Sequence, residues 1–242
     1  MRLSTNTILI TGGGSGIGLA LAVALAEHDN TVIICGRDKR KLHDACLEHP
    51  NITAIPCDLN NKVEIQSLVT TIQDKFPSLN MLVNNAGIQL NGIRFDELPF
   101  EDIEKEIAVN LTAPLFLIYL LLPILARQKS SAIVNVTSSL AITPKTNALS
   151  YCASKAAMHS ATYSLRQELT QTPIRVVEVM PGLVDTAMTQ GRGQHKMPPG
   201  DMAQGIIDGL KSDKDNIVCK QALALSYLQR LSPKLANRMV NK

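Results

Sequence analysis

Short apolar runs alternate with amphipathic or charged segments along most of this 242-residue chain. The runs are rich in Val and Ile and hold few polar residues, a pattern typical of strands that are buried on both faces of a parallel sheet. Six runs share this pattern: residues 7–10, 31–35, 52–57, 81–83, 132–136 and 174–179. Helices are predicted between and after them, among them residues 19–27, 62–76 and 151–171. This order predicts an α/β fold with a doubly wound parallel sheet, in a single domain over residues 1–242.

A glycine-rich turn follows the first predicted strand directly. Residues 11–18 read TGGGSGIG and lead into the helix predicted from residue 19. Glycines permit positive φ angles and a close approach of the backbone, and the amino terminus of a helix attracts an anion. The turn therefore favours the phosphates of a dinucleotide, bound on a Rossmann-type fold. Its GxxxGxG spacing differs from the common GxGxxG fingerprint, so a tight turn without a ligand is the alternative.

Two charged residues follow the second predicted strand, where dinucleotide folds contact the adenosine ribose. Arg37 can give two parallel hydrogen bonds to a 2′-phosphate, which favours NADP(H). Asp38 can accept hydrogen bonds from the ribose hydroxyls, which favours NAD(H). We predict NADP(H) as the preferred cofactor, with NAD(H) possible. Both residues could also be ordinary solvated members of a turn.

The charge and composition argue against several other classes of protein. The net charge of +3 is small, Trp is absent and aromatic residues make up only 3% of the chain, so a nucleic-acid partner has little support. The five cysteines form no CxxC motif, and the five histidines show no metal-ligand spacing. We therefore predict reduced thiols in a cytoplasmic protein and no metal site.

One uncharged stretch, residues 111–126, raises the question of a membrane span. Its 16 residues are fewer than the roughly 20 that a span requires, and Pro114 and Pro123 interrupt it. We predict a buried helix here and no transmembrane segment.

Tyr151 and Lys155 lie four residues apart on a predicted helix, and therefore on the same face of it. A free Tyr has a pKa near 10, too high for efficient acid–base catalysis near neutrality. At about 5 Å and an effective dielectric constant near 20, a Lys ammonium would stabilise the phenolate by roughly 3 kcal/mol and lower the pKa of Tyr151 by about 2. The two residues are a candidate pair for carbonyl reduction, and an ordinary surface pair is the alternative. His159, two turns further along, is expected to pack or to face solvent rather than to act as a base.

Seven motifs occur in the order that is found in the short-chain dehydrogenase/reductase family. They are TGGGSGIG (11–18), CDL (57–59), NNAG (84–87), Asn110 in AVNL, NVTSS (135–139), YCASK (151–155) and PGLVDT (181–186). Together they cover about the first 190 residues, and the chain resembles the single-domain branch of this family. The segment from residue 216 onward departs from many members. It looks similar to the oxidoreductases found with teichoic-acid D-alanylation genes.

The resemblance implies roles for individual residues. Tyr151 would be the acid/base and Lys155 its activator. Ser138 would orient the substrate, and Asn110 would hold a proton-relay water. The residues implied to bind the cofactor are Gly12, Ser15, Gly16, Ile17, Gly18, Arg37, Asp58, Leu59, Asn85, Ala86, Gly87, Tyr151, Lys155, Pro181, Gly182, Val184 and Thr186.

Three loops near the predicted strand ends are expected to contact the substrate: residues 89–94, 140–147 and 187–199. The region near 187–200 contains several Gly and Pro residues and predicts a mobile lid, with a plain surface loop as the alternative. Apolar residues in these loops, such as Leu140, Ile142 and Met188, favour a mostly apolar substrate.

A homodimer or homotetramer is predicted, because in the family the helices after Glu101 and after Tyr151 often form a dimer interface. The dense apolar residues at 115–125 fit a helix that is buried on more than one side. A helical tail near residues 221–242 mixes Leu with Lys and Arg, and we expect it to pack on a neighbour rather than lie on a membrane surface.

The predicted function is that of an NADP(H)-dependent oxidoreductase, which transfers hydride between the nicotinamide cofactor and a small carbonyl or alcohol substrate. The alternatives are an NAD-dependent alcohol dehydrogenase and a non-catalytic regulator that senses a dinucleotide. The intact set of Ser138, Tyr151 and Lys155 argues against the regulator, because a sensor needs no acid/base.

Overall fold

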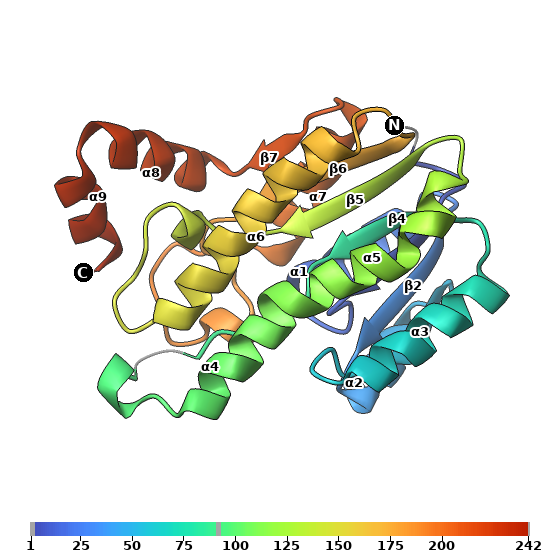
Figure 1. The fold of residues 1–242 in the computed structure, drawn as a ribbon, viewed down its shortest axis with the longest axis horizontal. Coiled ribbons are helices and arrows are strands. Elements are labelled where there is room, and N and C mark those ends of the chain that lie inside the picture. Colours follow the sequence, from blue (N-terminus) through green and yellow to red (C-terminus); the bar gives the residue numbers. More distant parts are fainter. Residues whose placement is uncertain (1–2, 91–92, 242) are drawn as a thin grey trace.

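One parallel sheet organises the protein in the computed structural model, which describes residues 3–90 and 93–241 (Figure 1). Its seven strands lie in the order β3-β2-β1-β4-β5-β6-β7, and all neighbouring pairs are parallel. They are β1 (Thr7–Thr11), β2 (Thr31–Gly36), β3 (Ile52–Pro56), β4 (Leu79–Asn84), β5 (Ser131–Val136), β6 (Ile174–Met180) and β7 (Asn216–Val218). The strand order reverses between β1 and β4, and ligands of such sheets bind outside the carboxyl ends of the strands at this point. The predicted doubly wound α/β fold is confirmed.

Helices cover both faces of the sheet. One layer contains α1 (Gly16–Ala26), α2 (Lys39–Glu48) and α7 (Pro199–Lys211), and the other contains α3 (Lys62–Lys75), α5 (Ala113–Ala126) and α6 (Leu149–Glu168). Figure 1 shows α3, α5 and α6 on the near face. The remaining helices are α4 (Phe100–Ile107), α8 (Lys220–Leu231) and α9 (Pro233–Val240).

The strands are apolar at every position because each face meets its own core. Ile8 and Ile10 belong to the cluster under α1 and α7, whereas Leu9 belongs to the cluster under α3 and α5. Successive side chains of a strand point to opposite faces, so a strand between two helical layers needs no polar positions. All five residues of β1 are buried.

The boundaries of several elements differ from those predicted. The strand predicted at 81–83 is Leu79–Asn84, and the helix predicted at 151–171 is Leu149–Glu168. A short seventh strand, Asn216–Val218, pairs with β6 and was not among the six predicted. Three residues carry too little periodicity to be recognised, and only the neighbouring strand defines this segment.

A continuous helical stretch, Phe100–Ala126, includes the uncharged run, and by length and composition it could cross a membrane. The core helix of a globular protein meets the same criteria. Here Leu117, Leu121 and Leu125 are completely buried in the core beneath the sheet. The predicted buried helix is therefore longer than the run that suggested it.

The C-terminal tail forms α8 and α9, which project beyond the sheet in Figure 1. It returns to the loop between β5 and α6. Thr143 Oγ1 donates to Gln229 Oε1 at 3.4 Å, and the backbone N–H of Thr146 donates to Asn241 Oδ1 at 2.6 Å. The tail therefore packs on one of the loops that are predicted to contact the substrate.

Candidate active site

A cavity of about 430 Å³ opens at the carboxyl ends of the central strands. Most of the residues implied to bind a cofactor line it, and so does the Tyr–Lys pair. The predicted residues in its wall are Gly12, Ser15, Gly16, Ile17, Arg37, Asp58, Leu59, Asn85, Ala86, Gly87, Tyr151, Lys155, Pro181 and Thr186. Residues from six separate parts of the sequence thus meet at the point where the strand order reverses.

The glycine turn fits closely against the end of β4. Gly12 has a φ of +66°, and a Cβ atom there would lie 2.9 Å from the Cα of Ala86. A Cβ atom at Gly18 would lie 2.4 Å from Asn85 Nδ2, so this glycine serves the packing of the turn rather than the cavity wall. The side chain of Thr11 accepts hydrogen bonds from the backbone N–H groups of Asn85 and Ala86, both at 3.0 Å.

Two of the predicted cofactor residues point away from the cavity. Val184 is only 3% exposed and belongs to the core under α7. Gly182 lies against the tail, because a Cβ atom there would meet Cys219 Sγ and Gln221 Oε1 at 2.9 Å.

The far end of the cavity carries two basic residues and one acid. Asp38 begins α2, and its Oδ1 accepts from the backbone N–H groups of Arg40 and Lys41, both at 3.1 Å. Arg37 is exposed and lines the cavity together with Lys41, which the sequence analysis missed. The carboxylate is therefore bound to the start of α2, and its Oδ2 lies 3.8 Å from Lys41 Nζ. Arg37, Asp38 and Lys41 all line the cavity. Asp is a preferred residue at the start of a helix, so the sequence could have indicated that the Asp38 side chain binds the first turn of α2.

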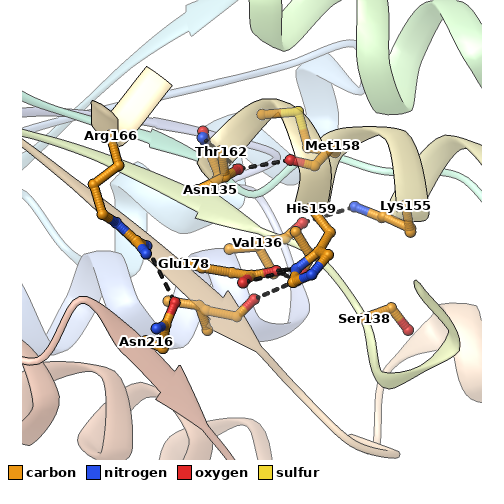
Figure 2. Close-up of polar contacts among 12 residues, drawn as sticks. Asn135, Val136, Ser138, Lys155, Met158, His159, Thr162, Arg166, Glu178 and Asn216 are labelled. Atoms are coloured by element: carbon orange, nitrogen blue, oxygen red, sulfur yellow. Dashed lines mark hydrogen bonds and ion pairs between the residues drawn. The ribbon is translucent and has the colours of Figure 1, made fainter. Parts of the chain in front are cut away.

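Ser138, Tyr151 and Lys155 come together at the end of β5 and the start of α6. The Ser138 hydroxyl hydrogen-bonds Tyr151 and also accepts from the backbone N–H of Leu140 at 3.1 Å. Lys155 Nζ donates to the carbonyl of Val136 at 2.8 Å and lies 6.0 Å from the centre of the Tyr151 ring. Figure 2 shows this lysine pointing to the end of β5.

The pKa of Tyr151 differs in direction from the sequence-based expectation. Burial raises the pKa of Tyr151 to about 12, although the hydrogen bond from Ser138 opposes this. Burial also lowers the pKa of Lys155 to about 8. An effective dielectric constant near 20 leaves out the burial of the pair, and desolvation disfavours the charged forms of both groups. The phenol therefore keeps its proton at neutral pH.

Asn110 lies in a π-helical turn, Ala108–Thr112, between α4 and α5. Its Oδ1 accepts from the N–H of Ile88 at 2.8 Å, and its Nδ2 donates to the carbonyl of Ile88 and to Ser154 Oγ. The side chain thus joins the loop after β4 to α6. Such irregular helical turns are frequent at functional sites.

Glu106 is a completely buried acid that the sequence analysis missed. Its Oε1 accepts from the backbone N–H of Leu90 at 2.8 Å, and its Oε2 accepts from the hydroxyl of Ser150. Burial raises the pKa of Glu106. Glu106 therefore connects the loop after β4 to the residue that precedes Tyr151. A single Glu on a helix gives no signal of this in the sequence.

His159 neither faces solvent freely nor packs as an apolar ring. Its Nδ1 lies 2.8 Å from Glu178 Oε1, and Glu178 is buried in the middle of β6 (Figure 2). The same carboxylate oxygen accepts from Thr137 Oγ1 at 2.6 Å. This network ties α6 to β6 and to Thr137, which follows β5 and precedes Ser138 in the chain.

A comparison with known proteins identifies the family. The family model described as short chain dehydrogenase matches residues 6–197. The chain belongs to the short-chain dehydrogenase family. It is 40% identical to the uncharacterized oxidoreductase DltE of Bacillus subtilis over 90% of this chain and 89% of that protein. It is 31% identical to an uncharacterized oxidoreductase of Staphylococcus aureus over 88% of this chain and 94% of that one.

Solved structures of other short-chain dehydrogenases share the fold. A short chain dehydrogenase from Burkholderia cenocepacia, in complex with NADP, matches with a TM-score of 0.88 and 23% identity over the whole of both chains. The 3-ketoacyl-(acyl-carrier-protein) reductase from Brucella melitensis, complexed with NADH, matches with a TM-score of 0.85 and 24% identity over 91% of this chain and all of that one. The predicted family and its DltE-like subgroup are confirmed, and this short-chain dehydrogenase is an oxidoreductase.

Because Glu106 is buried, we predict that its ionisation destabilises the folded protein as the pH rises. The folded protein holds the Glu106 proton more tightly than the unfolded chain does, so the free energy of unfolding falls as the pH rises through the folded-state pKa. A Glu106→Gln variant can keep both partners without a charge, with its Oε1 accepting from the N–H of Leu90 and its Nε2 donating to Ser150 Oγ. We expect its urea midpoint to exceed that of the wild type at pH 8, and the difference to shrink toward pH 5.

Glu104→Gln is the matched control, because Glu104 is exposed on the same helix. Its midpoint should follow the wild type across the range. A difference between Glu106→Gln and the wild type that is constant from pH 5 to pH 8 would contradict the assignment.

Proposed function

We propose that this short-chain dehydrogenase is an NADP(H)-dependent reductase of small carbonyl compounds, with Tyr151 as the acid/base. The observation that carries the proposal is the meeting of Ser138, Tyr151 and Lys155 beside the cavity that begins at the glycine turn. The reverse reaction, oxidation of the alcohol, uses the same groups. Substrate would enter between the loops that begin at residues 89, 140 and 187. Residues 91 and 92 of the first loop lie outside the described residues.

The bound nicotinamide cofactor supplies the hydride. The Tyr151 phenol donates the proton that the carbonyl oxygen needs, and its raised pKa keeps that proton available at neutral pH. The Ser138 hydroxyl orients the carbonyl oxygen and stabilises the negative charge that develops on it. Lys155 holds a positive charge beside the phenolate that is left behind. Asn110, in the turn Ala108–Thr112, would hold a water that returns a proton to Tyr151.

The preference for NADP(H) rests on the charges at the far end of the cavity. Arg37 and Lys41 offer two cations for a 2′-phosphate, whereas the Asp38 carboxylate is bound to the first turn of α2 and pairs with Lys41 at 3.8 Å. An NAD-dependent alcohol dehydrogenase would need Asp38 for the ribose hydroxyls. Structurally similar relatives carry either cofactor, so the support comes from these side chains alone.

We also propose that the protein is a homodimer or homotetramer that works in the cytoplasm. All five cysteines are free, in keeping with reduced thiols. The apolar rings of Tyr119 on α5 and Tyr163 on α6 are 74% and 55% exposed, as expected of an interface on these helices.

Replacing Tyr151 with Phe should lower kcat/KM for carbonyl reduction about 1,000-fold, because the proton donor is lost. The dissociation constant for NADPH should stay within about 3-fold, since the hydroxyl does not carry cofactor affinity. The absorbance of NADPH measures kcat/KM, and its fluorescence measures the dissociation constant. Tyr163→Phe is the control on the same helix, and it should match the wild type. Turnover that survives in Tyr151→Phe would refute the role of this residue.

Replacing Arg37 with Ala should weaken NADPH binding about 10-fold and NADH binding less than about 2-fold, because only NADPH carries the 2′-phosphate. Titrations of both cofactors at one stated salt concentration measure this. Arg40→Ala is the control, since Arg40 is exposed on α2 and does not line the cavity. Equal losses for the two cofactors would argue against the preference for NADP(H).

Light scattering at micromolar concentration should give two or four times the 26.3 kDa of one chain. Charged substitutions at exposed apolar positions of α5, such as Tyr119→Glu, should lower that mass, because they would place unpaired charges in the interface. A monomer in the wild type would contradict the proposed assembly.

A further inference from the structure

Arg192 spans the gap between two loops that flank the candidate active site. It lies between the short helical turn Ala187–Thr189 and α7, and it is half-buried. Its Nη1 donates to Gln89 Oε1 at 2.8 Å, and its Nη2 donates to the carbonyl of Met188. The guanidinium is also close enough to Tyr151 for each group to affect the charge of the other. A cation thus lies beside the proposed proton donor, on the side where substrate would enter.

No carboxylate neutralises Arg192 within residues 3–90 and 93–241: both of its named partners are neutral oxygens. Two other cations of these loops are paired. Lys196 lies 3.1 Å from Asp185, and Arg94 lies 3.0 Å from Asp96. Burial lowers the pKa of Arg192, which indicates that its surroundings disfavour an uncompensated charge. A partly desolvated cation without a counter-ion favours an anion brought by a ligand.

Glu106, a carboxylate that acts electrostatically on Tyr151, does not serve as this counter-ion. Glu106 is buried, and its two oxygens accept from Leu90 and Ser150. Ile88 and Met188 are apolar residues of the cavity wall, and the carbonyl of Met188 accepts from Arg192. Arg192 therefore places a positive charge next to an apolar part of this wall.

We propose that Arg192 binds a carboxylate on the substrate, so that this reductase prefers oxo acids to neutral carbonyl compounds of the same size. The inference rests on the proposed function and names its substrate class. One planar guanidinium matches the two oxygens and the single charge of a carboxylate, whereas a doubly charged phosphate calls for more donors than this site offers. The substrate would therefore be mostly apolar, as expected from Leu140, Ile142 and Met188, with a carboxylate at one end.

The test compares oxo acids with their methyl esters, which keep the carbonyl and remove the charge. The pairs are pyruvate, acetoacetate and levulinate with the corresponding methyl esters, which set the carbonyl at three distances from the carboxyl carbon. In the wild type, kcat/KM should favour the acid in at least one pair. In Arg192→Met, the acid-to-ester ratio of that pair should fall about 100-fold, since a charged hydrogen-bonded partner is lost. Activity on the ester should stay within about 3-fold.

Two further variants separate charge from position. Arg192→Lys keeps the charge with a single donor group, and its ratio should lie between those of the wild type and Arg192→Met. Arg127→Met removes an exposed cation at the opposite end of the sheet and should leave the ratio unchanged. An ester preference in all three wild-type pairs would overturn the proposal. An equal loss of activity on acid and ester in Arg192→Met would also overturn it, because Arg192 would then only connect the two loops through its hydrogen bond to Gln89. Weaker NADPH binding with an unchanged ratio would assign Arg192 to the cofactor and would also overturn it.

A binding measurement keeps this proposal distinct from the proposed function. The Tyr151→Phe protein with NADPH bound is titrated with the same three acids, and cofactor fluorescence reports the complex. Adding Arg192→Met should weaken the tightest acid about 100-fold, while the matching ester is unaffected. If no carbonyl compound is turned over by the wild type but this difference appears, the reductase proposal fails and the carboxylate site stands. If the acids bind equally well with and without Arg192, the site is refuted whatever the activity.

Discussion

Thr11 and Asn85 hold the carboxyl ends of β1 and β4 together, and the geometry of the site depends on this contact. The Thr11 hydroxyl accepts from two backbone N–H groups of the β4 end, and Asn85 Nδ2 donates back to the carbonyl of Thr11 at 2.9 Å. The glycine turn can lie against β4 only because Gly12 and Gly18 lack a Cβ atom. Because the strand order reverses here, the same contact positions the mouth of the cavity and Gly87, which borders Asn110 and Lys155.

The site brings buried ionisable groups together. Tyr151, Lys155 and Glu106 are all buried, and burial shifts the pKa of each group in the direction that favours its neutral form. Hydrogen bonds compensate part of this cost: Lys155 donates to the carbonyl of Val136, and Glu106 accepts from two donors. At neutral pH the phenol therefore keeps its proton, while Lys155, with a pKa of about 8, stays mostly charged but loses its proton more readily than a solvated lysine.

The periodicity and the motifs of the sequence determined the fold and the central part of the site. Apolar strands such as 7–10 and 132–136 predicted a sheet that is covered on both faces, because a strand between two helical layers has no polar face. The order of seven motifs indicated the family, and the resemblance implied that Ser138, Tyr151 and Lys155 act together. These features could be predicted because they are local: each depends on spacing within a few residues, or on chain order.

Only the tertiary structure decided the features that depend on contacts between distant segments. Glu106 is 44 residues from Ser150 and Arg192 is 103 residues from Gln89, yet each pair forms a hydrogen bond. The direction of the Tyr151 pKa shift was also a tertiary property, because burial outweighs the hydrogen bond from Ser138 and the charge of Arg192. Sequence spacing describes neighbours along one helix or strand. Desolvation, and the lack of a counter-ion at Arg192 among the described residues, depend on everything that packs around a group, and that is set when the whole chain folds.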